Sequence, residues 1–171
     1  TPGIDEDTRK QCYEIIQLNS RLLINLLNDV VDISCLDVKN MKFDLKVCDA
    51  VPLCEGIIQT VEGIKQTQAA LSFETTLPSL EIETDIFRLP QVLINILVNA
   101  TKFTKEGSII LRLEQNEEGM AQFSVTDTGC GIPLEKQPTI FNRFERVDEK
   151  SQGTGIGLSI CQFIIDQLGG N

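Results

Sequence analysis

Apolar residues recur at three- and four-residue intervals over the first part of the chain, from about Asp5 to Asp37. The recurring positions are Cys12, Ile16, Leu23, Leu26, Val30 and Ile33. This spacing predicts a long amphipathic helix, which neither glycine nor proline interrupts. A helix of about 30 residues reaches ~45 Å, so we expect it to project and to pack against a partner helix. The alternative is a helix that lies on its own domain.

The next stretch first alternates like a strand and then recurs like a helix. Residues 41–47 place Phe43, Leu45 and Val47 on one side, and we expect this side to face inward. A helix is expected from Val51 to about Gln68.

Two short strands, a hairpin and a last helix make up the remaining pattern. The short strands cover 70–74 and 80–83, the hairpin pairs 108–114 with 120–127, and the last helix runs over 155–168. Because the strands alternate with helices but also form a hairpin, the sheet is expected to be mixed or antiparallel.

Between the short strands and the hairpin, a helix is expected to run from Thr84 to about Phe103. Thr84 is the candidate N-cap. Pro90 lies inside this segment and lacks an N–H donor, so we expect a kink or a helix start near Leu89.

Composition and charge narrow the classes of partner. The chain has 171 residues, of which 42% are hydrophobic, enough to bury the core of one domain with an appendage. A formal charge of -10 disfavours DNA or RNA as the main partner, although a small anionic ligand can still bind at a local basic site. No apolar run is long enough to span a bilayer, so we expect no direct membrane contact. A cytoplasmic location is expected, with a membrane anchor possible only through other segments of a parent protein.

Cysteine and histidine usage excludes several chemistries. The six cysteines form no CxxC pair, which favours reduced, mostly buried thiols over a structural zinc site. Histidine is absent, so this chain supplies no imidazole as base, nucleophile or phosphoacceptor.

Two asparagines and a lysine share one face of the helix that ends near Phe103. Asn95, Asn99 and Lys102 stand at i, i+4 and i+7 within LINILVNATKFT, so two amides and an ammonium point the same way. Amide oxygens suit a magnesium ion that phosphates also coordinate. The alternative is an exposed helix face with two surface asparagines.

A glycine-rich segment follows the second hairpin strand, with the sequence Asp127-Thr128-Gly129-Cys130-Gly131-Ile132. Its carboxylate can accept a hydrogen bond from an exocyclic amine, while the glycines let a flat ring approach the backbone. An ordinary turn fits the same letters, and Asp-Thr-Gly is also the aspartic protease signature.

Two further segments complete the candidate chemistry. The first contains Phe141, Arg143, Phe144 and Arg146 within IFNRFERVD. The second is Gly153-Thr154-Gly155-Ile156-Gly157-Leu158 at the start of the last helix, where unpaired amides and the helix dipole favour phosphate. It is not a Walker A loop, because no Gly-Lys-Ser/Thr follows.

Taken in this order, the four clusters resemble the ATP-binding catalytic domain of sensor histidine kinases, within the gyrase, Hsp90, histidine kinase and MutL ATPase superfamily. Residues 95–104 look like the N box, 127–132 the G1 box, 141–144 the F box and 153–158 the G2 box. The segment LLINLLNDVVDISCLDVKNMKF resembles the second helix of the dimerisation and phosphotransfer domain with its hinge. The segments VTDTGCGIP and QGTGIGLSIC are similar in sequence to those of hybrid sensors of Bacteroides-like bacteria.

This resemblance implies an α+β fold, in which a mixed, largely antiparallel sheet packs on helices in a two-layer sandwich. This is the Bergerat ATP-binding fold, here preceded by the long projecting helix. The resemblance divides the chain into residues 1–40, which belong to the dimerisation and phosphotransfer domain and its hinge, and residues 41–171, the catalytic domain without its C-terminal strands.

The resemblance also implies a role for each site residue. Asn99 would coordinate Mg²⁺, and Asp127 would accept a hydrogen bond from the adenine amine. Asn95, Lys102 and Arg146 are the expected catalytic residues, with Arg143 as second choice to Arg146 at the γ-phosphate. The expected nucleotide-binding set is Asn95, Asn99, Lys102, Phe103, Asp127, Gly129, Gly131, Ile132, Phe141, Phe144, Gly153, Thr154, Gly155, Ile156, Gly157 and Leu158.

The implied activity is transfer of the ATP γ-phosphate to a histidine outside these residues, for relay to an aspartate of a response-regulator receiver domain. ATP, Mg²⁺, a receiver domain and a second copy bound through the N-terminal helix are the expected partners. The family's acceptor histidine lies on the helix before the first one here, so the fragment is not expected to phosphorylate itself. Pro90 departs from the polar residue that the family usually carries before QVL.

Two alternatives remain at the level of sequence. A superfamily ATP hydrolase usually has a glutamate at the position of Asn95, and an asparagine cannot act as that base. A nucleotide-sensing or dimerising module without chemistry is the other alternative, and the presence of both Asn99 and Asp127 counts against it.

Overall fold

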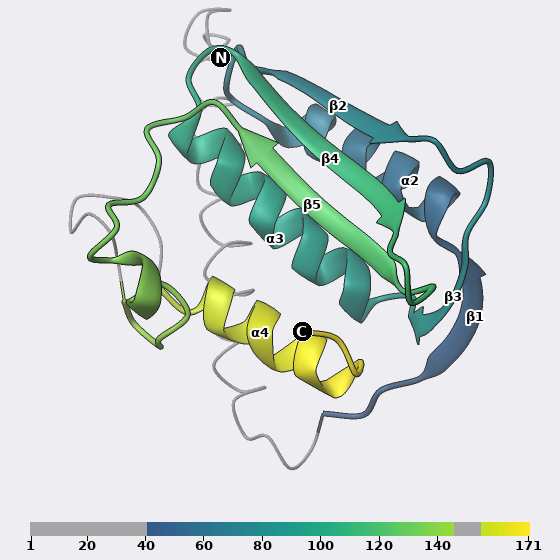
Figure 1. The fold of residues 1–171 in the computed structure, drawn as a ribbon. Coiled ribbons are helices and arrows are strands. Elements are labelled where there is room, and N and C mark those ends of the chain that lie inside the picture. Colours follow the sequence, from purple (N-terminus) through teal and green to yellow (C-terminus); the bar gives the residue numbers. More distant parts are fainter. Residues whose placement is uncertain (1–40, 146–154) are drawn as a thin grey trace, which may run out of the picture. The chain divides into compact units, whose positions relative to one another are not determined.

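A computed structural model describes residues 41–145 and 155–171 (Figure 1). The strands are β1 (Leu45–Asp49), β2 (Ala70–Thr75), β3 (Glu81–Asp85), β4 (Ser108–Gln115) and β5 (Ala121–Asp127). The helices are α2 (Ala50–Ile64), α3 (Arg88–Phe103), a short 3-10 helix (Gln137–Thr139) and α4 (Gly157–Gln167). The predicted helix over residues 5–37 and the predicted domain over residues 1–40 lie outside the described residues.

The described strands form two sheets. β4 lies at the centre of a three-stranded sheet, parallel to β2 and antiparallel to β5, while β1 and β3 form a separate antiparallel pair. The expected hairpin is β4 and β5, and the parallel β2–β4 pair makes the sheet mixed, as predicted. Helices α2 and α3 cover one face of the three-stranded sheet, which gives the expected two-layer α+β arrangement (Figure 1).

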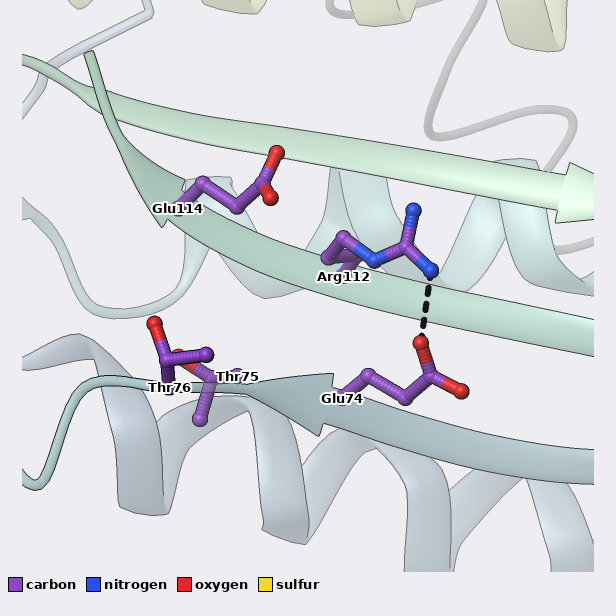
Figure 2. A pocket seen from close by; sticks show the side chains of 5 residues that line it. All are labelled: Glu74, Thr75, Thr76, Arg112 and Glu114. Carbon is purple, nitrogen blue, oxygen red and sulfur yellow. Dashed lines mark hydrogen bonds and ion pairs between the residues drawn. The ribbon is translucent and has the colours of Figure 1, made fainter.

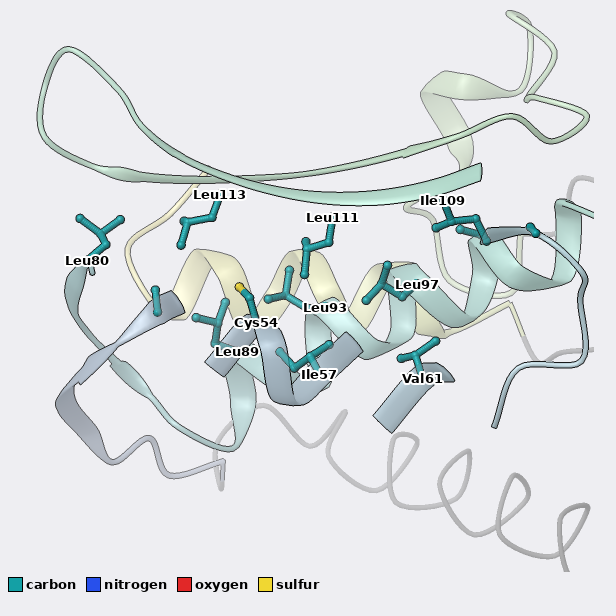
Figure 3. Packing of buried hydrophobic residues seen from close by; sticks show 13 residues of the cluster. Cys54, Ile57, Val61, Leu80, Leu89, Leu93, Leu97, Ile109, Leu111 and Leu113 are labelled. Atoms are coloured by element: carbon teal, nitrogen blue, oxygen red, sulfur yellow. The ribbon is translucent and has the colours of Figure 1, made fainter. Parts of the chain in front are cut away.

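The core lies between this sheet and the two helices. Ile109, Leu111 and Leu113 alternate along β4 and are fully buried, because every second residue of a strand faces the same side. Leu97 of α3 and Val61 of α2 are also fully buried, and Figure 3 shows their side chains on the same side of the sheet as those of β4. Apolar side chains two residues apart in the strand thus pack against apolar side chains three to four residues apart in the helices.

The opposite face of the sheet is polar. Arg112 of β4 forms an ion pair with Glu74 of β2 at 2.6 Å, and both side chains are about half exposed. A hollow of about 130 Å³ beside this pair is lined by Glu74, Thr75, Thr76, Arg112 and Glu114 (Figure 2). It contains none of the predicted site residues and is smaller than the ~300 Å³ typical of the smallest ligand pockets.

The prediction that Leu45 and Val47 face inward is wrong. Leu45 is 46% exposed and Val47 is 68% exposed. β1 begins at Leu45 and pairs only with β3, with Val47 opposite the exposed Glu83. The other face of this ribbon carries Ile82, which packs against the core. The alternation of apolar residues in β1 therefore did not determine which face is buried; the register of its pairing with β3 did.

The N-terminus of α3 differs from the expected one. Thr84 belongs to β3, and the Asp85 carboxylate accepts hydrogen bonds from the N–H groups of Phe87 and Arg88, at 2.9 and 3.0 Å. Asp85, and not Thr84, is therefore the side chain that satisfies the start of the helix. Pro90 is the third residue of α3, where an N–H would have no intrahelical acceptor, so the helix begins at Arg88 near the predicted start.

Two other helix boundaries also shift. α2 ends at Ile64, four residues before the predicted Gln68, and the next residue, Lys65, is already extended with a ψ of 146°. The Thr67 hydroxyl lies within hydrogen-bond distance of the carbonyl groups of Thr104 and Lys105. α4 begins at Gly157, two residues after the predicted start. Within 41–145 and 155–171, no helix has the length and apolarity needed to cross a bilayer.

Candidate active site

The polar residues of α3 lie on the side of the helix away from the core. Leu93 and Leu97 are buried, whereas Asn95 and Asn99 are half-buried and Lys102 is exposed. The helical spacing that predicted a shared polar face is therefore present in the structure. Asn99 makes no side-chain hydrogen bond with the residues that the structure describes, which leaves a half-buried amide available to a ligand.

Asn95 faces the beginning of α4, which packs against α3. Its amide nitrogen donates to the sulfur of Cys161 at 3.5 Å. A β-carbon placed on Gly157 would stand 2.8 Å from that nitrogen and 2.9 Å from the amide oxygen. The G2 segment can therefore approach α3 this closely only because residue 157 has no side chain.

Asp127 is fastened to the end of α3. Its Oδ1 accepts hydrogen bonds from the backbone N–H of Gly129 at 2.8 Å and from the Thr104 hydroxyl at 3.3 Å. A β-carbon on Gly129 would stand 2.6 Å from the Phe103 carbonyl oxygen, and the Cys130 N–H donates to the same oxygen at 3.4 Å. The G1 turn thus packs directly on the last turn of the helix that carries the asparagines.

The other carboxylate oxygen of Asp127, Oδ2, has no hydrogen-bond partner in the described part of the chain, and the residue is exposed. An exposed carboxylate oxygen is an acceptor for a donor on a ligand. This arrangement fits the predicted acceptor for an exocyclic amine.

A cavity of about 400 Å³ opens between the end of α3 and the G1 turn. Its lining consists of Lys102, Phe103, Lys105, Glu106, Thr128, Gly129 and Cys130. Two lysines against one glutamate give the lining a positive balance that suits an anionic group. Three predicted site residues, Lys102, Phe103 and Gly129, line it, whereas Asn95, Asn99 and Asp127 do not.

The F segment is joined to the G2 segment through the backbone. The N–H of Phe144 donates to the carbonyl of Gly155 at 3.0 Å, and a β-carbon on Gly155 would stand 2.7 Å from the Glu145 carbonyl oxygen. Gly155 has a φ of 73°, and Phe144 is the one non-glycine residue of the described ranges with a positive φ, at 65°.

Exposed aromatic side chains accompany this junction. Phe144 is 66% exposed, and Phe141 and Ile132 are also exposed. These three predicted contacts do not line the 400 Å³ cavity.

The remaining predicted site residues differ in exposure. Gly131 and Arg143 are exposed, while Ile156 is buried and Leu158 is half-buried. Arg146, Gly153 and Thr154 lie outside the described residues.

The donor set fits a magnesium ion that phosphates help to hold. The described residues contain no cluster of three carboxylate, cysteine or histidine side chains that could hold a metal by themselves. The Asn99 amide, which has no hydrogen-bond partner among the described residues, would supply one neutral oxygen, with phosphates and waters supplying the others. Burial raises the pKa of Cys54 to about 12 and also raises that of Cys48, so neither of these two thiols is a metal ligand.

The roles of two residues at the site were not predicted from the sequence, although the predicted N box over residues 95–104 includes Thr104. Thr104 and Cys161 hold Asp127 and Asn95, respectively, and both are buried. Thr104 directly follows the helix, where periodicity carries no signal, and Cys161 looks like any apolar residue of α4. The expectation of mostly buried thiols holds for Cys54 and Cys161, while Cys130 is exposed.

Comparison with known proteins gives the same assignment. The family described as histidine kinase-, DNA gyrase B- and HSP90-like ATPase matches residues 84–171. The virulence sensor protein BvgS of Bordetella bronchiseptica is 33% identical over 97% of this chain and 14% of its own length. The aerobic respiration control sensor protein ArcB of Escherichia coli is 30% identical over 95% of this chain and 22% of its own length. The chain thus spans less than a quarter of these relatives.

Solved structures agree with the sequence matches. Full-length ShkA in complex with AMPPNP has a TM-score of 0.75 and 27% identity over 98% of this chain and 35% of that chain. The catalytic domain of the histidine kinase ThkA has a TM-score of 0.64 and 34% identity over 75% of this chain and 82% of that chain. The chain therefore belongs to the histidine kinase-, DNA gyrase B- and HSP90-like ATPase family, among the ATP-binding catalytic domains of sensor histidine kinases.

Proposed function

We propose that this chain binds ATP together with Mg²⁺ and delivers the γ-phosphate to a histidine that lies outside these 171 residues. The chain contains no histidine, so the acceptor belongs to another segment or subunit. A receiver domain would then take the phosphate onto an aspartate, and a second copy of the protein would pair through the region of residues 1–40.

One observation carries the proposal. The polar face of α3 lies between two glycine-dependent contacts, with Gly157 against Asn95 at one end and Gly129 against Phe103 and Asp127 at the other. A purine bound at Asp127 and a triphosphate extending toward the start of α4 would pass along Asn99 and Lys102. The positive end of the α4 dipole and the N–H groups of its first turn favour phosphate at that position.

The residues divide the work as follows. Asp127 Oδ2 accepts from the adenine amine, and Phe103 packs beside the base. Asn99 would hold Mg²⁺ through its amide oxygen, and the bound ion would neutralise charge on the phosphates. Lys102 lies near the phosphates, and Arg146, or Arg143 in second place, stabilises the charge spread over the transferred phosphoryl group. Asn95 lies against Gly157 and donates to Cys161, so it holds the start of α4 in position.

Hydrolysis of ATP by this chain alone is the less favoured function. Water attack needs a general base near the γ-phosphate, and the amide of Asn95 has no proton-accepting nitrogen or carboxylate. A module that only senses nucleotide is also less favoured, because both Asn99 and Asp127 are present.

Calorimetric titration of the 171-residue chain with AMPPNP, with and without Mg²⁺, tests the proposal. Wild type is expected to bind more tightly with Mg²⁺, and Asn99→Ala is expected to remove most of that gain, about tenfold in affinity. Gln122→Ala is the matched control, because this amide is exposed on the outer face of β5. Equal affinity with and without Mg²⁺ in wild type would contradict the metal assignment, and absence of binding would contradict the nucleotide site.

A histidine-containing partner segment tests the transfer step. With ATP labelled at the γ-phosphate, label is expected to appear on the partner histidine only when the 171-residue chain is present. If inorganic phosphate is released from ATP equally fast with and without the histidine-containing segment, the hydrolase alternative is favoured.

A further inference from the structure

We propose that Thr104 is a positioning residue that orients Asp127 and thereby sets the preference for a purine with an amino group at position 6. The inference rests on the proposed function, since it concerns recognition of the base at the same site. Thr104 lies one residue beyond α3, and its side chain is 0% exposed.

The backbone of Thr104 is held on both sides. Its N–H donates to the Ala100 carbonyl at 3.0 Å, and its own carbonyl accepts from the Thr67 hydroxyl. Because the residue is fully buried and its main chain is fixed, the side chain has little freedom to turn. Its hydroxyl donates to Asp127 Oδ1 at 3.3 Å, and a buried hydroxyl without such a partner would be costly.

Two donors converge on the same oxygen of Asp127. The Gly129 N–H reaches Oδ1 at 2.8 Å and the Thr104 hydroxyl reaches it from the end of the helix. Together they resist rotation of the carboxylate about its terminal bond. Oδ2 is left without a partner among the described residues, so one oxygen faces the ligand as a hydrogen-bond acceptor only.

An acceptor held in one orientation discriminates between purines. An amino group at position 6 donates to it, hydrogen at that position offers nothing, and a carbonyl oxygen repels it. Without the Thr104 hydroxyl, Gly129 alone holds Oδ1, so the carboxylate can turn and the gain from the amino group falls. Thr104 is fully buried and does not line the 400 Å³ cavity, so binding that does not involve the amino group should stay the same.

The test compares two ligands on three proteins. AMPPNP carries the amino group, and purine riboside triphosphate lacks it. Wild type is expected to prefer AMPPNP, Thr104→Val to lose roughly tenfold in affinity for AMPPNP and less than twofold for the purine riboside compound, and Thr104→Ser to behave as wild type. Valine keeps the shape of threonine and removes only the hydroxyl.

Other results would overturn the inference. An equal loss for both ligands in Thr104→Val would mean a purely structural role, and an unchanged preference would mean that the hydroxyl does not orient Asp127. If wild type binds neither ligand, the proposed function itself fails. If wild type and Thr104→Val both bind and prefer AMPPNP to the same extent, only the inference about Thr104 fails.

A second variant and a double-mutant cycle distinguish the proposed role from a folding defect. Thr104→Ala adds no bulk, and circular dichroism reports whether either variant is folded. In an Asp127→Ala background, removal of the Thr104 hydroxyl is expected to cause no further loss of AMPPNP affinity. Losses that add in the double variant would show that Thr104 acts independently of Asp127.

Discussion

The amide of Asn95 lies so close to α4 that residue 157 has no room for a β-carbon. Such an atom on Gly157 would stand 2.8 Å from Asn95 Nδ2 and 2.9 Å from Oδ1. Two segments that are about 60 positions apart along the chain are therefore matched to each other, an amide on one helix and a missing side chain on the next.

Gly157→Ala is expected to push the Asn95 amide aside or to move α4. We expect a loss of about 1 to 2 kcal/mol in the free energy of unfolding, measured by urea titration, and weaker binding of AMPPNP. Asn95→Ala removes the atoms that clash, so the double variant should recover most of the stability lost by Gly157→Ala. Strictly additive losses would contradict a direct clash between these two residues.

Gly129→Ala is expected to detach the G1 turn from α3. The added atom would meet the Phe103 carbonyl oxygen at 2.6 Å and Asp127 Oδ1 at 2.8 Å, and the helix backbone cannot give way. We expect a loss of roughly 1 to 3 kcal/mol in stability and a loss of AMPPNP binding, measured by urea titration and calorimetry. A variant with wild-type affinity would show that the turn is not held as described.

Gly56→Ala is expected to stabilise the protein. Gly56 lies inside α2, and a β-carbon there meets nothing within 4 Å. Alanine loses less backbone entropy than glycine on folding, so the free energy of unfolding should rise by about 0.5 to 1 kcal/mol, measured as a higher midpoint in thermal denaturation. Gly107→Ala is the contrasting control, because its φ of 107° and the Thr128 side chain both oppose a β-carbon.

Asp85 is expected to make stability depend on pH in the acid range. Burial by itself would raise the pKa of this carboxyl, but hydrogen bonds from the N–H groups of Asp44, Phe87 and Arg88, together with the Arg88 charge, hold the pKa below its ordinary value of 3.8. The unfolded chain therefore binds the proton more readily, and stability falls as pH drops from about 4 through the lowered pKa.

The measurement is urea denaturation from pH 6 down to pH 3 for wild type and Asp85→Asn. The variant should lose stability at pH 6, by about 1 to 3 kcal/mol, and show a flatter dependence on pH. Some dependence should remain, because N–H groups of Leu80 and Val51 also lower the pKa of Asp49. Parallel curves for the two proteins would contradict the role of Asp85.

Most elements of the fold were predictable from local patterns. The alternation of Ile109, Leu111 and Leu113 and the helical spacing around Leu97 are strong signals, because a single face of each element is buried. The phase of β1 was not predictable. Its alternation is as clear as that of β4, yet Leu45 and Val47 are exposed, since pairing with β3 alone decides which side meets the core.

The candidate site divides in the same way. The sequence alone determined the types and order of the groups, with Asn95, Asn99 and Lys102 on one helical face and glycines at 129 and 157, because helical periodicity and residue chemistry are local properties. The tertiary structure decided that Gly157 faces Asn95, that Thr104 holds Asp127, and that Asp85 replaces Thr84 at the start of α3. These contacts depend on where separate elements meet in space. No local sequence pattern specifies which residue a buried hydroxyl bonds to, or which side chain packs against a glycine.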